Sequence, residues 1–120
     1  MDIDIQTETN RWYEDVFGGK DRKKQIELAF SKGGELASAL QDEVYGFTHW
    51  ATYWQLEEKK YYIELGNSPE VRLEVITDLK GTVKAVDFQF QDQLEPWTSA
   101  ENQDYDLLMT YAKVVELYDE

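Results

Sequence analysis

The sequence contains no cysteine, so neither a disulfide framework nor a thiolate metal site can form. No apolar run approaches the length that crosses a bilayer. The first residues have neither the basic region nor the apolar core of a signal peptide, and Asp2 stands where myristoylation requires glycine. We therefore expect a cytoplasmic protein that does not attach to a membrane.

Histidine is almost as scarce, since His49 is the only one in the chain. No cysteine or elbow motif gives His49 a nucleophile to activate, which favours a packed or surface histidine. A single histidine with scattered carboxylates does not favour zinc or iron, and the calcium-loop pattern is absent. The glycine pairs at 18–19 and 33–34 lack the pattern of a phosphate cradle. We expect no enzyme, no cofactor and no metal site.

Basic residues are few compared with acidic ones. The 120 residues include 25 Asp and Glu but only 12 Lys and Arg, for a formal net charge of −13. Residues 1–32 hold seven acids and six bases, whereas residues 85–120 hold nine acids and one base, Lys113. This excess either aids solubility or forms a functional acidic surface. In both cases it repels nucleic acid and anionic membranes, attracts basic proteins and favours a monomer.

The composition nevertheless predicts a folded chain, because four Trp, eight Tyr and five Phe are unusual in acidic disordered proteins. The length suits one domain, residues 1–120. Helical patterns cover residues 9–17 and 35–45. Residues 21–31 also alternate as a strand would, but their good helix formers favour a helix.

Strand patterns follow at residues 47–56, 61–65, 71–75 and 83–91, with a polar turn at 57–60. Thr98 and Glu101 fit a capping box that opens a last helix. Its apolar face carries Leu108, Tyr111, Ala112, Val115 and Tyr118. The sequence therefore predicts an α+β fold with N-terminal helices, an antiparallel meander of about four strands, and a C-terminal helix packed on the sheet.

Aromatic residues cluster between Phe47 and Tyr62. Adjacent pairs such as Tyr61 and Tyr62 must point to opposite sides of a sheet, so one set fills the core and the other lies on the second face. Stacking on single-stranded bases would need a positive groove, and only Lys59 and Lys60 are near. Protein binding through aromatic anchors is the better functional interpretation, although plain core packing is favoured over both.

The region from Asp87 to Asp106 is the candidate contact surface, because it contains six acids and no base. Pro96 and Trp97 add a rigid turn with an aromatic anchor. The alternative is that Glu101 and Asp104 cap the helix while the other acids are simply solvated. The candidate partner-binding residues are Asp87, Asp92, Glu95, Trp97, Glu101, Asp104 and Asp106.

In size, charge and aromatic content the chain resembles the small acidic DNA-mimic proteins of bacteria and phage, such as antagonists of histone-like nucleoid proteins. The resemblance concerns overall character and involves no shared motif. It implies an inhibitor that occupies the basic nucleic-acid-binding surface of a partner protein without binding nucleic acid itself. Two alternatives stay open: an immunity protein that neutralises a toxin nuclease, and an accessory or scaffold domain that binds through its aromatic sheet face.

Overall fold

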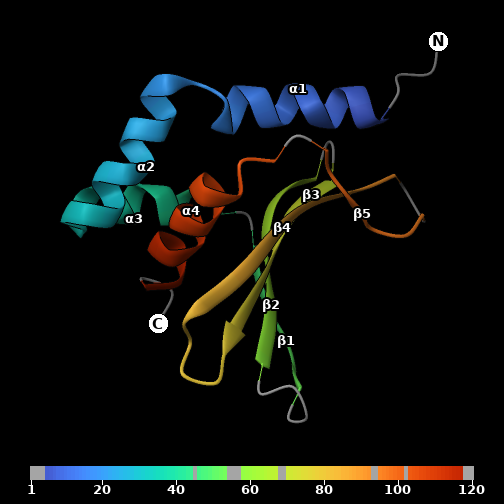
Figure 1. Ribbon diagram of the computed structural model, residues 1–120. Coiled ribbons are helices and arrows are strands. Elements are labelled where there is room, and N and C mark those ends of the chain that lie inside the picture. Colours follow the sequence, from blue (N-terminus) through green and yellow to red (C-terminus); the bar gives the residue numbers. More distant parts are fainter. Residues whose placement is uncertain are drawn as a thin grey trace.

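The computed structural model describes residues 5–44, 46–53, 58–67, 70–92, 95–101 and 103–117. Three helices come first, five strands follow, and a fourth helix ends the described chain (Figure 1). Their bounds are α1 Ile5–Phe17, α2 Lys20–Lys32, α3 Gly34–Asp42, β1 Gly46–Tyr53, β2 Glu58–Asn67, β3 Glu70–Asp78, β4 Val83–Gln91, β5 Thr98–Ser99 and α4 Tyr105–Leu117.

The five strands form one antiparallel sheet in the order β1-β2-β3-β4-β5, so each strand pairs with its neighbours in the sequence. The predicted α+β architecture is confirmed, and the two-residue strand β5 extends the expected meander by one short strand. The predicted polar turn at 57–60 is wrong in part, because β2 already begins at Glu58. Glu58 to Lys60 pair with the end of β3 instead.

One face of this sheet is buried and the other is not. In β3, Val71, Leu73 and Val75 are buried and alternate with the half-buried Arg72 and Glu74. Successive side chains of a strand point to opposite faces, so this pattern places one set under the helices. Tyr61 is buried and Tyr62 half-buried, as expected for adjacent residues of a strand.

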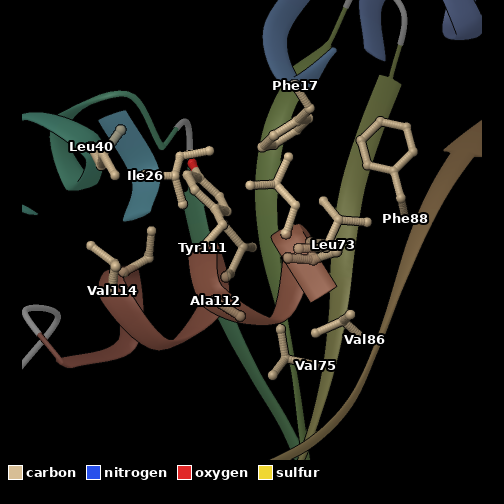
Figure 2. Close-up of a cluster of buried hydrophobic side chains, with 14 of the residues drawn as sticks. Phe17, Ile26, Leu40, Leu73, Val75, Val86, Phe88, Tyr111, Ala112 and Val114 are labelled. Carbon is tan, nitrogen blue, oxygen red and sulfur yellow. The ribbon is translucent and has the colours of Figure 1, made fainter. Parts of the chain in front are cut away.

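The helices cover the buried face (Figure 1). Helix α4 packs against β4 and also contacts α2 and α3, which pack against each other. Figure 2 shows the sheet side chains Leu73, Val75, Val86 and Phe88 in one buried cluster with the α4 residues Tyr111 and Ala112. The helix α1 adds Phe17, whose ring centroid lies 5.2 Å from that of Tyr111 and 6.3 Å from that of Phe88 in edge-on contacts. Such aromatic pairs contribute about 1 kcal/mol each beyond their buried area.

The prediction of a helix over residues 21–31 is confirmed by α2. Ile26 and Ala29, three residues apart, are both buried, whereas Leu28 and Phe30 are about half exposed. A strand would have placed Ile26, Leu28 and Phe30 on one face. The Arg22 guanidinium of α2 donates to both carboxylate oxygens of Glu43, which lies just after α3. This ion pair ties the two helices together.

The predicted capping box at the last helix is wrong. Thr98 belongs to β5, and the backbone N–H of Ala100 donates to the carbonyl of Phe88 at 2.8 Å. This pairing holds the segment extended, so α4 begins only at Tyr105. Asp104 caps the helix instead, because its Oδ1 accepts a hydrogen bond of 3.1 Å from the N–H of Leu107.

The other boundaries differ by a few residues. The helix α1 begins at Ile5, not residue 9, and α3 ends at Asp42, before the predicted end at residue 45. The side chains of residues 45–57 lie outside the described part of the chain, and Tyr118 lies outside it as well. The roles predicted for the aromatic residues between Phe47 and Trp54, and for His49, therefore concern side chains that the structure does not describe.

The β3–β4 turn is held by a carboxylate. Asp78 Oδ1 accepts hydrogen bonds of 2.9 Å from the N–H groups of both Thr82 and Lys80. Gly81 adopts a φ of 96°, which a residue with a Cβ rarely does. These backbone donors, Thr82 first, hold the pKa of Asp78 below its ordinary value of 3.8.

We expect Asp78→Asn to be less stable than the wild type near pH 7, with a smaller difference in stability near pH 2.5. A carboxyl group whose pKa is lowered by folding contributes stability above its unfolded pKa, about 3.9. That contribution is lost as the pH falls through the lower folded pKa. Urea unfolding of both proteins at the two pH values measures the difference, and an equal difference at both would contradict the turn's role.

Candidate functional site

The sheet face that the helices leave uncovered carries polar and charged side chains. We call it the open face and define it by the residues that alternate with core residues along β2, β3 and β4; among those named below, Gln89 is itself buried and the others are half-buried. The strand pairing arranges them in two rows across the sheet. One row is Tyr62, Glu74 and Asp87; the other is Glu64, Arg72 and Gln89.

Arg72 is the centre of the open face. Its guanidinium carbon lies 3.9 Å from the ring centroid of Tyr62 and 3.9 Å from that of Trp97. Its Nε donates a 2.8 Å hydrogen bond to Oε1 of Gln89. Each cation–π contact is worth about 0.5–2 kcal/mol, depending on how far it is desolvated. Trp97 lies in the segment after β4. Its contact with Arg72 therefore holds that segment against the middle of the sheet.

The titration behaviour of these groups reflects their partial burial. Burial is the main cause that lowers the pKa of Arg72, opposed by Tyr62 and by the neighbouring carboxylates, Glu74 before the others. Burial is likewise the main cause that raises the pKa of Tyr62, and the charge of Glu74 adds to it. A guanidinium stays protonated at any physiological pH. The rings of Tyr62 and Trp97 therefore both lie against a permanent positive charge.

A second network fixes Asp87. One carboxylate oxygen, Oδ2, accepts hydrogen bonds from Ser99 Oγ at 2.6 Å and Gln89 Nε2 at 3.0 Å. The other, Oδ1, accepts one from Gln103 Nε2 at 2.8 Å. The same Gln103 amide accepts from the N–H of Phe88 at 2.6 Å. Asp87 thus holds β5 and the segment before α4 against β4, and its oxygens are already engaged.

A pocket of about 170 Å³ opens beside Arg72 and Trp97. A β-bulge between Glu64 and Gly66 disturbs the pairing of β2 with β3 at this point. The segment after β4 closes the other side, where Gln91 Nε2 donates to the carbonyl of Glu95 at 2.9 Å. The residues that line the pocket include Glu64, Gly66, Glu70, Arg72, Gln91 and Trp97.

Apart from Asp87 on β4, the predicted contact residues fall into two places. Asp92 and Glu95 are exposed on the β4–β5 segment, and Trp97 on the same segment is half-buried. Figure 1 shows this segment and α4 on opposite sides of the view.

The remaining predicted residues lie around the start of α4. Glu101 is exposed and precedes the helix, while Asp106 is exposed in its first turn. Asp104 caps α4, and its backbone N–H donates to the hydroxyl of Tyr13 at 2.9 Å. Burial is the main cause that raises the pKa of Tyr13, whose hydroxyl accepts this hydrogen bond. Glu101 and Asp104 therefore do not project together from a helix.

Sequence reasoning did not identify Arg72, Glu64 or Glu70 as site residues, and it considered Tyr62 only as a member of the aromatic cluster. The alternation of Val71, Leu73 and Val75 with charged residues was the available signal, because it places Arg72 on the opposite face. The stacking of Arg72 on Trp97 depends on the path of the chain after β4, which no local pattern encodes.

Among the described residues, no group of three or more histidine, cysteine, aspartate or glutamate side chains is placed to hold a metal ion. None of the helices, as far as they are described, is long and apolar enough to cross a membrane. Comparison with known protein families, with curated proteins and with solved structures finds no match. The geometry of the open face and the charges around it therefore carry the functional argument.

We expect Asp104→Ala to lower the free energy of unfolding by about 1 kcal/mol, because the capped N–H of Leu107 loses its acceptor. The bond to Tyr13 persists, since the main chain makes it. Asp106→Asn is the control and should change stability by only a few tenths of a kcal/mol. Equal losses in urea unfolding would show that the two acids act only through the helix dipole.

Proposed function

We propose that this protein binds a basic protein and occupies the surface with which that partner binds nucleic acid. The proposal rests on one observation: a set of exposed carboxylates forms no ion pair with a basic side chain of the described residues. Within the part of the chain that the structure describes, the ion pairs are Arg22–Glu43 and Lys60–Glu74. The exposed acids of the predicted surface take part in neither: Asp92, Glu95, Glu101 and Asp106.

Unpaired carboxylates favour a cationic partner for two reasons. A formal charge of −13 attracts a basic protein over several ångströms and speeds its encounter at low salt. Asp92 and Glu95 are exposed on the same short segment, so both can engage basic side chains of one nucleic-acid-binding groove. The partner would be a nucleic-acid-binding protein or a nuclease in the cytoplasm.

The open face supports the same proposal by supplying an ordered anchor. Tyr, Trp and Arg are the residue types that dominate the binding energy of protein interfaces. Here Tyr62, Arg72 and Trp97 are already stacked, so little side-chain entropy remains to be lost on binding. The exposed Asp92 and Glu95 lie on the segment that carries Trp97.

The alternative functions differ in partner or in driving force. An immunity protein would use the same acidic surface against one toxin nuclease. A scaffold that binds through its aromatic sheet face would use Tyr62 and Trp97 without the carboxylates. The exposed Asp92 and Glu95, on the segment that carries Trp97, form no ion pair within the described part of the chain, which favours the charge-driven function instead.

The test is a pull-down from cell extract, followed by affinity measurements with the captured partner over a series of salt concentrations. The test variant is Asp92→Asn/Glu95→Gln/Asp106→Asn, which leaves the Asp104 cap intact. The matched control is Glu14→Gln/Asp15→Asn/Glu27→Gln, which removes the same charge from exposed positions of α1 and α2.

We expect the test variant to bind at least tenfold more weakly, a loss of about 1.4 kcal/mol, with a shallower dependence on salt. The control should stay within about twofold of the wild type, and the partner should be a basic protein. The proposal fails if the test variant also stays within about twofold, or if the control loses as much as the test variant.

A further inference from the structure

We propose that the pocket beside Trp97 receives one lysine side chain of the partner. This inference rests on the proposed function, because a basic partner supplies the lysine. Three properties of the pocket lead to it: the charge of its lining, its size, and the apolar wall that Trp97 contributes.

The lining carries one more negative than positive charge. Glu64 and Glu70 contribute carboxylates, and Arg72 contributes the single guanidinium. Further carboxylates, Glu74 and Asp87, lie close enough to Arg72 to act on its charge. Arg72 contacts the rings of Tyr62 and Trp97 and donates to Gln89 through Nε. The formal charge of the lining is therefore −1, and the exposed Glu70 is the carboxylate that can attract a cation.

The size fits one long, narrow side chain. A volume of about 170 Å³ equals that of about five or six water molecules in the liquid. A lysine side chain has five heavy atoms beyond Cα, and its ammonium group is compact. Gly66 has no side chain to narrow the pocket where the β-bulge forms its wall.

The wall suits the two parts of a lysine. Trp97 offers apolar surface to the methylene stem, while Glu64, Glu70 and the Gln91 amide can accept from the ammonium. A carboxylate in the same place would face two negative charges. An apolar side chain would remove water from those carboxylates without providing a donor, which is unfavourable.

In the experiment, a synthetic octalysine peptide is added to the full chain in about 50 mM salt, and NMR follows the signals of the protein. The indole N–H signal of Trp97 is assigned by its absence in Trp97→Phe. The same peptide with every ε-amine acetylated is the uncharged comparison. Glu70→Gln tests the pocket, and Glu35→Gln, at an exposed position of α3, removes the same charge elsewhere.

We expect octalysine to shift the Trp97 signal until it saturates, and the acetylated peptide to leave it in place. Glu70→Gln should weaken binding about fivefold or more and Glu35→Gln less than twofold, with both melting temperatures unchanged. The pocket proposal is wrong if Glu70→Gln and Glu35→Gln weaken octalysine binding equally. It is also wrong if octalysine binds without shifting the Trp97 signal. Octa-arginine binding as tightly as octalysine overturns the assignment to lysine.

The outcome also separates this inference from the proposed function. If the captured partner loses affinity with Asp92→Asn/Glu95→Gln/Asp106→Asn but not with Glu70→Gln, the pocket is wrong and the acidic contact stands. If neither variant weakens the partner, the proposed function and the pocket are both wrong.

Discussion

One-sided burial of the sheet is the constraint on which the rest of the structure depends. Apolar and charged residues alternate along β3, so the face that packs on the helices and the face that remains open are fixed together. A register shift of one residue would place Arg72 and Glu74 in the core, where unpaired charges are strongly unfavourable. The contacts of Phe88 with Tyr13 and Phe17 hold the buried side in place. The same alternation that buries the core residues therefore determines which residues lie on the open face.

On that open face, Arg72 holds neighbouring segments together, as the apolar side chains do in the core. It joins three separate pieces of chain, since Tyr62 comes from β2, Gln89 from β4 and Trp97 from the segment after β4. Lysine could not replace it, because only a planar guanidinium can stack between two rings and still donate through Nε. The pocket and the exposed acids Asp92 and Glu95 depend on this arrangement for their position.

Local patterns in the sequence predicted most of the fold and little of the site. The bounds of β4, residues 83–91, agree with the prediction because Val86, Phe88 and Phe90 alternate clearly and a glycine turn precedes them. The start of α4 was misplaced, because Thr98 and Glu101 match a capping pattern that Asp104 fulfils in the structure. Local spacing cannot show that Thr98 pairs with Phe90 in the sheet. The stacking of Trp97 on Arg72 is equally non-local.

The central claim is that a basic protein contacts the side of the molecule that carries the β4–β5 segment. Site-specific photo-crosslinking tests it most directly, with a photoreactive amino acid placed either at Asp92 or at Ser38, both exposed. Asp92 lies just after β4, and Ser38 lies on α3, in the helical layer. The account predicts that a protein with a basic isoelectric point is captured from Asp92 and not from Ser38, and that high salt abolishes the adduct. Capture from Ser38 alone, or equally from both positions, would contradict it.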